Sequence, residues 1–156
     1  MPDEITVRAE AADSLIAVRL VDAMVTEMEQ LYSLPAGTGL GTGAPPSDFT
    51  PPGGTFLVIY AGGKPVAGGG VKRDDDGVAE IKRMYVVPAA RRQGLGRQLL
   101  EALEDRAREL GYARIRLDTG ARQPHAQAMY ERAGYHPIEN YNGNQQASFW
   151  GEKILR

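Results

Sequence analysis

The segment Val86–Arg97 constrains this chain more than any other stretch. An apolar run ends at a proline, and a basic turn with two glycines leads directly into an amphipathic helix pattern. A helix N-terminus leaves backbone N–H groups unpaired and carries a partial positive charge, so it attracts anions. Glycine lets a phosphate approach the backbone closely, and arginine adds charged, forked donors. The segment therefore predicts a diphosphate-binding turn between a strand and a helix.

The composition excludes several classes of function. The chain has 156 residues, the size of one domain, and a net charge of −2, which disfavours bulk binding to nucleic acid. It has no cysteine and only two histidines, which argues against disulfides, a thiol nucleophile and a metal site. We find no apolar run of membrane-spanning length and no leader pattern, so we expect a cytoplasmic protein without a membrane partner.

Hydrophobic periodicity divides the chain into alternating strands and helices. Strands are predicted at residues 5–10, 55–61, 66–73, 78–87, 114–118 and 147–155, and another begins near Tyr135. Helices are predicted from an N-cap at Asp13 to Tyr32, along a leucine stripe at 95–110, and from Pro124 to Arg132 or Ala133. Residues 35–54 contain five prolines and form a long loop. This order predicts an α/β (mixed α+β) fold, with helices on the faces of a mixed sheet.

Several types of phosphate-binding turn could account for Gly94 and Gly96. A dinucleotide-binding fingerprint needs a third glycine, but Leu99 stands at its place. A Walker-type loop needs Gly-Lys-Ser/Thr, which is absent, and the antiparallel meander predicted upstream fits neither fold. A loop that needs only flexibility stays open as the simpler interpretation. The pattern otherwise favours a phosphate-binding turn in a mixed sheet.

Two segments resemble the GNAT superfamily of acetyl-CoA-dependent N-acetyltransferases. Residues 78–100 (VAEIKRMYVVPAARRQGLGRQLL) are similar to its motif A, and residues 117–135 (LDTGARQPHAQAMYERAGY) to its motif B. The resemblance implies one acetyltransferase domain over residues 1–156, with a twisted, mostly antiparallel sheet and helices on both of its faces. It also implies that an acetyl group passes from acetyl-CoA to a primary amine by direct attack in a ternary complex.

The resemblance implies a set of residues that bind coenzyme A. Backbone groups of Met84, Tyr85 and Val86 would pair with the pantetheine arm like an added strand. The pyrophosphate would lie on backbone amides of the turn, namely those of Arg92, Gln93, Gly94, Leu95, Gly96 and Arg97. The Arg91 and Arg92 side chains would reach the phosphates, although solvated surface charges are an equal alternative. Gln123 stands where motif B usually carries asparagine, and it retains an amide there.

Two residues are predicted to move protons. Glu80 matches the catalytic glutamate of some family members, and its even spacing from Met84 puts both on one strand face unless a bulge intervenes. The alternative is an exposed carboxylate paired with Lys82 or Arg83. Tyr130 matches the family's general acid, which would protonate the departing sulfur, and its alternative is aromatic packing.

The acceptor side is less constrained. We expect the acceptor site to be walled by the first helix, residues 35–54, Arg83 and the amide-rich stretch 140–146. A carboxylate on the acceptor would bind Arg73, Arg83 or Arg122. We therefore expect a small-molecule amine such as an amino acid or related metabolite. A protein or peptide acceptor, a non-catalytic acyl-CoA sensor and a subunit role are the alternatives. A homodimer is expected by analogy with the family, and no nucleic-acid partner is expected.

Overall fold

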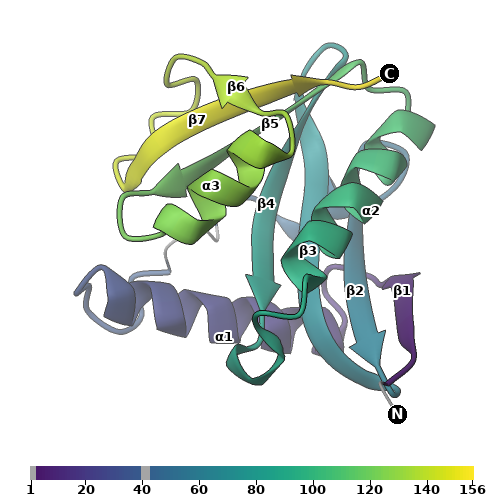
Figure 1. The fold of residues 1–156 in the computed structure, drawn as a ribbon, viewed down its shortest axis with the longest axis vertical. Coiled ribbons are helices and arrows are strands. Elements are labelled where there is room, and N and C mark those ends of the chain that lie inside the picture. Colours follow the sequence, from purple (N-terminus) through teal and green to yellow (C-terminus); the bar gives the residue numbers. More distant parts are fainter. Residues whose placement is uncertain (1–2, 40–42) are drawn as a thin grey trace.

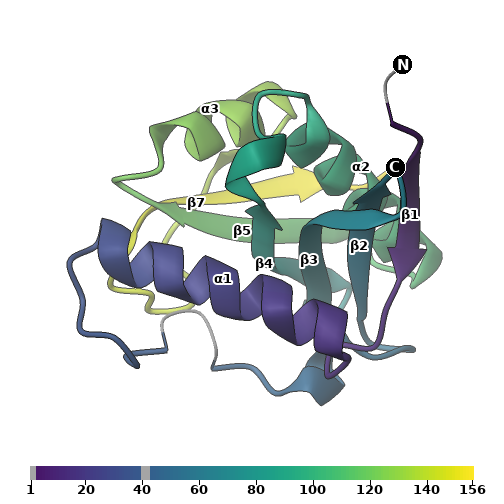
Figure 2. The ribbon, with the colours of Figure 1, turned by 90° about the horizontal axis from the view of Figure 1, so that it is seen from below.

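The computed structural model describes residues 3–39 and 43–156. The elements are β1 (Ile5–Ala9), α1 (Leu15–Leu31), η1 (Pro46–Phe49), β2 (Thr55–Ala61), β3 (Lys64–Asp75), β4 (Val78–Val86), η2 (Pro88–Ala90), α2 (Leu95–Glu109), β5 (Arg114–Gly120), α3 (Pro124–Arg132), β6 (His136–Pro137) and β7 (Ala147–Ile154). Within these residues, seven strands form one sheet in the order β1-β2-β3-β4-β5-β7-β6 (Figure 1). Helix α1 covers one face, and α2 and α3 cover the other (Figure 2). The predicted fold class is confirmed.

The sheet is antiparallel except where β4 meets β5. These two strands pair in parallel over three positions, from Val78 with Arg114 to Glu80 with Arg116. Beyond that point they run in different directions (Figure 1). Because no strand fills the gap, the later parts of β4 and β5 form the two sides of a V.

Each face of the sheet has its own apolar core. Phe56, Val58 and Tyr60 of β2 pack toward α1, whereas Leu57 and Ile59 pack toward α2. Both faces of β2 are therefore buried, which explains its uninterrupted apolar sequence. The predicted leucine stripe of α2 is also confirmed, since Leu95, Leu99, Leu100, Leu103 and Ala107 are all buried.

Three predicted boundaries differ from the structure. The N-cap of α1 is Ser14, not Asp13, because the Ser14 hydroxyl accepts a hydrogen bond from the Ala17 amide at 3.3 Å. Strand β5 continues to Gly120 through pairing with β7, which the sequence of β5 does not reveal. The loop at 35–54 contains the turn η1, whose Phe49 is buried against the sheet.

A bulge interrupts β4. Tyr85 pairs with Gly68 of β3, and Lys82 pairs with Gly70, so two residues of β4 lie opposite one of β3. Arg83, one of these two residues, has a φ of 61°, a left-handed conformation that is uncommon for a residue with a side chain.

The bulge reverses which face each later residue of β4 occupies. Ile81, Met84 and Val86 pack in the core under α2, and Tyr85 packs in the core under α1. Glu80 and Met84 therefore lie on opposite faces of the sheet. The exception stated for the even spacing therefore applies: a bulge intervenes, and its extra residue shifts the alternation by one.

Phe49 anchors the long loop. A Cβ atom at Gly70 would lie 2.5 Å from the Phe49 ring, so this ring packs directly on the β3 backbone. We expect Phe49→Ala to lower the free energy of unfolding by about 3–5 kcal/mol, because it leaves a cavity in the α1 core. Urea denaturation measures this loss. The control Leu15→Ala removes a side chain that is 63% exposed and should cost less than about 0.5 kcal/mol. Equal losses would show that Phe49 does not anchor the loop.

Candidate active site

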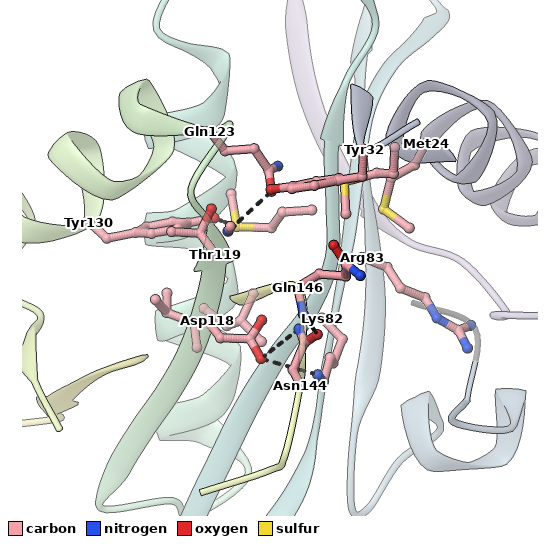
Figure 3. Close-up of a pocket in the computed structure, with 15 residues that line it drawn as sticks. Met24, Tyr32, Lys82, Arg83, Asp118, Thr119, Gln123, Tyr130, Asn144 and Gln146 are labelled. Carbon is pink, nitrogen blue, oxygen red and sulfur yellow. Dashed lines mark hydrogen bonds and ion pairs between the residues drawn. The ribbon is translucent and has the colours of Figure 1, made fainter. Parts of the chain in front are cut away.

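A cavity of about 210 Å³ occupies the V between β4 and β5. Its lining comes from α1 (Met24, Met28), the residue after α1 (Tyr32), β4 (Ile81, Lys82, Arg83, Met84), β5 (Leu117, Asp118, Thr119, Gly120), the start and end of α3 (Gln123, Tyr130) and the segment before β7 (Asn144, Gln146) (Figure 3). Three of the segments predicted as acceptor walls, namely the first helix, Arg83 and the 140–146 stretch, line this cavity, and their contact with an acceptor stays a prediction. No residue of the described part of 35–54 lines it.

Tyr130 lies in the cavity wall and is 7% exposed. Its hydroxyl donates to the Met84 sulfur at 3.8 Å, and its ring packs edge-on against Tyr135 with 6.0 Å between centroids. Burial, together with the negative charge of Asp118, raises the pKa of Tyr130 to about 12. The hydroxyl therefore keeps its proton at neutral pH and can act as a hydrogen-bond donor. Tyr135 is itself buried in the core on the α2 side of the sheet.

Gln123 connects two sides of the cavity. Its Oε1 accepts from the Tyr32 hydroxyl at 3.0 Å and from the Gly120 amide at 3.3 Å. A Cβ atom at Gly120 would lie 1.6 Å from the Tyr32 hydroxyl, so this approach requires glycine. Gln123 thus holds the end of α1 against the β5–α3 turn, and its predicted contact with pantetheine stays a prediction.

The predicted diphosphate-binding turn has the features that an anion needs. Gly94 has a φ of 77°, and α2 begins after it without a side-chain cap or an acidic residue in its first turn. The Gln98 amide donates to the Gly94 carbonyl, so the amides of residues 95–97 precede the helical bonding pattern and project from the helix end. A Cβ atom at Gly94 would meet nothing within 4 Å, which leaves the approach open. The turn fits a pyrophosphate.

The two arginines before this turn differ in their surroundings. Arg91 donates through Nη2 to both carboxylate oxygens of Glu27, at 2.8 and 2.7 Å, and through Nε to the Val86 carbonyl at 3.0 Å. It therefore ties α1 to the end of β4 and occupies a carbonyl that was predicted to pair with pantetheine. Arg92 is exposed, and no ion pair to it is found within residues 3–39 and 43–156. Its charge is the more available of the two.

Glu80 is not among the residues that line the cavity. It is 3% exposed, and its carboxylate accepts from the Tyr141 hydroxyl at 2.7 Å and the Asn142 amide at 3.2 Å. Lys82 lies 3.4 Å away and Lys72 3.8 Å away. Burial and the Glu80 charge raise the pKa of Tyr141, which keeps this donor protonated. The predicted pairing with Lys82 is present, although the carboxylate is buried. The role as base stays a prediction.

Asp118 is a carboxylate in the cavity wall that sequence reasoning missed. Its Oδ2 accepts from the side-chain amides of Asn142 and Asn144, and Lys82 lies 3.8 Å away. Asn142 also donates to Glu80, so one amide links the two carboxylates. The only sequence signal was its place at the end of the predicted strand 114–118, where a strand residue can face a cleft.

The three arginines predicted to bind a carboxylate of the acceptor differ in their surroundings. Arg73 pairs with Asp76 on an exposed turn, and Arg122 donates to the Leu31 carbonyl at 2.9 Å. Arg83 alone of the three lines the cavity. No group of residues suited to a metal ion occurs within the described parts of the chain, and no helix there could cross a membrane.

The comparisons with known proteins agree with this geometry. The model of the acetyltransferase (GNAT) family matches residues 25–135. The chain belongs to the GNAT family. It is 30% identical over 124 residues to YjgM, an uncharacterized N-acetyltransferase of Escherichia coli, and the match covers 74% of each chain.

Two solved structures share the fold. A GNAT-family acetyltransferase from Staphylococcus aureus has a TM-score of 0.80 at 15% identity and covers 98% of this chain and 100% of its own. The PaiA N-acetyltransferase of Thermoplasma acidophilum, solved in complex with coenzyme A, has a TM-score of 0.72 at 15% identity, covering 97% and 99%. This GNAT protein is an acetyltransferase, and its family uses acetyl-CoA.

The free charge of Arg92 leads to a prediction about cofactor binding. We expect Arg92→Ala to weaken coenzyme A binding about tenfold, because one charge-assisted contact of roughly 1.4 kcal/mol is lost. Isothermal titration calorimetry measures the dissociation constant. The matched control Arg106→Ala removes an exposed arginine at the other end of α2 and should leave the constant unchanged. Equal weakening in both variants would mean that only net charge matters.

Proposed function

We propose that this GNAT protein transfers the acetyl group of acetyl-CoA to the primary amine of a small molecule in a ternary complex. The observation that carries the proposal is the cavity in the V of β4 and β5, which has a hydroxyl donor on one wall and a carboxylate close by. Its volume of about 210 Å³ suits a small acceptor better than a folded protein surface.

The binding of acetyl-CoA would use the turn and the open edge of β4. The amides of residues 95–97 and the Arg92 side chain would hold the pyrophosphate. Backbone groups of Met84, Tyr85 and Val86 border the gap that β5 leaves, where an extended pantetheine arm would lie. At Val86 the arm would meet a carbonyl already bonded to Arg91.

Acetyl-CoA supplies an activated acetyl thioester: the acceptor nitrogen bonds to the acetyl carbon, the carbon–sulfur bond breaks, and coenzyme A leaves as a thiol. The chain must manage two protons of the ammonium form of the acceptor. One proton passes to a carboxylate before the nitrogen can attack. The second leaves the nitrogen after it has bonded to the acetyl carbon, and it replaces the proton that a hydroxyl donor gives to the departing sulfur. Tyr130 is the donor that the cavity offers.

Two carboxylates compete for the first proton. Glu80 was predicted from the sequence, and Asp118 faces the cavity where an ammonium group would enter. We favour Asp118, because Glu80 is enclosed by Tyr141 and Asn142 and would have to act through its neighbours. Glu80 then positions Asn142, which in turn holds Asp118.

The test of this function is an amine screen that follows free thiol release. The chain has no cysteine, so a thiol reagent reports only coenzyme A. Turnover with small amines, and with none of a set of peptides, would support the proposal. Calorimetric binding of acetyl-CoA without thiol release from any amine would indicate an acyl-CoA sensor and would contradict it.

Tyr130→Phe keeps the ring in place and removes the donor. We expect kcat to fall about 100-fold, the usual scale for one acid–base group, with little change in the KM for acetyl-CoA. Since burial raises the pKa of Tyr130 to about 12, the wild-type kcat should show no basic limb from this residue between about pH 7 and 10. Stopped assays across that range measure both. Full activity of the variant would leave Tyr130 with a packing role.

Asp118→Asn and Glu80→Gln form a matched pair of isosteric changes. We expect Asp118→Asn to lower kcat about 100-fold and Glu80→Gln to lower it less than about tenfold, because only Asp118 reaches the cavity. Steady-state kinetics at saturating substrates separates the two, with melting temperatures checked for both variants. The reverse order of effects would identify Glu80 as the base.

A further inference from the structure

One hydrogen-bond donor of the Arg83 side chain lacks an acceptor among the described residues. Its Nη2 donates to the Ala44 carbonyl, and its guanidinium lies over the Phe49 ring with 4.7 Å to the ring centre. Its Nε is buried and has no hydrogen-bond partner in the part of the chain that the structure describes. A buried donor without an acceptor is costly, so such groups in native proteins are usually explained by a bound molecule or a functional role.

The Arg83 guanidinium also lacks an ion-pair partner among the described residues. No ion pair forms on it within residues 3–39 and 43–156, whereas Arg91 pairs with Glu27 and Arg116 pairs with Glu152 and Asp74. Burial lowers the pKa of the Arg83 guanidinium, and the nearest acidic influence, Asp48, offsets this only in part. Arg83 is half-buried, and a partly desolvated charge is stabilised by a counter-charge, so an anion is the element that the described groups do not supply.

The backbone supports a functional reason for this placement. Arg83 sits on the β4 bulge with a φ of 61°, and bulges re-aim side chains next to active sites. A residue with a long side chain is held here in a conformation that favours glycine. The neighbouring cation, Lys82, already pairs with Glu80 and Asp118. Arg83 is therefore the cation that can still bind an anion.

We infer that the acceptor carries a carboxylate that Arg83 binds, so that the substrate class is that of amino acids and similar amino-carboxylates. This inference rests on the proposed function, since it assigns the acceptor of that reaction. Figure 3 shows Tyr130 and Asp118 on one side of the cavity and Arg83 across from them, with its side chain directed away from both. An amine placed between Asp118 and Tyr130 leaves the rest of a short acceptor extending toward Arg83. The planar guanidinium then meets a planar carboxylate, its best-matched anion.

The experiment compares pairs of acceptors that differ in one group. Each pair is an α-amino acid and the amine left when its carboxylate is removed, assayed by thiol release with wild-type enzyme, Arg83→Gln and Arg83→Lys. We expect Arg83→Gln to lower kcat/KM for the amino acid at least about tenfold and to leave the plain amine within about threefold. Arg83→Lys should restore part of the difference. The ratio of kcat/KM for the amino acid to kcat/KM for the plain amine is compared between enzymes, because this cancels the difference in basicity of the two amines.

The matched control is Arg73→Gln, which changes an exposed arginine near the end of β3 and should leave the kcat/KM of both acceptors unaffected. A second measurement needs no turnover: with coenzyme A present, an N-acetyl amino acid should raise the melting temperature of the wild type but not of Arg83→Gln. Equal loss for both members of each pair would show that Arg83 only braces the 44–49 segment, and would overturn the inference. Absence of thiol release with every amine would overturn the proposed function, while the melting measurement would still decide the role of Arg83.

Discussion

The candidate site depends on the separation of β4 from β5. Their parallel pairing covers three positions and ends at Glu80 and Arg116. A sheet that stayed closed would bury the backbone edge of β4 and leave no cavity. Because the strands separate, α1, α3 and the segment before β7 can all reach the gap, and the N-terminus of α2 lies just beyond the end of β4.

The cavity also combines groups of opposite charge. Asn142 donates to both Glu80 and Asp118, and Lys82 lies near both, so the two carboxylates share their partners. Such sharing keeps both carboxylates satisfied while only one of them faces the cavity. Arg83 has no such partner among the described residues, and this asymmetry is what a ligand with an ammonium and a carboxylate would complement.

Much of the fold could be predicted because its signals are local. The leucine stripe of α2, the turn around Gly94 and the apolar run of β2 each specify their element within a few residues. The bulge in β4 could not be predicted, because its register depends on the glycines of β3 and on the burial of neighbouring side chains. For that reason the sequence left open whether Glu80 and Met84 share a face, and the register of β3 and β4 decided that they do not.

By itself the sequence determined the strand–turn–helix that fits a diphosphate, and the family to which the chain belongs. Those features depend on residues that are close together in the chain, so their spacing can be read without the tertiary structure. Only the tertiary structure decided that Asp118 faces the cavity, that Arg91 pairs with Glu27, and that half-buried Arg83 has no ion-pair partner among the described residues. These facts depend on which distant segments meet, and no local pattern encodes the partner of a charged side chain that lies 64 residues away.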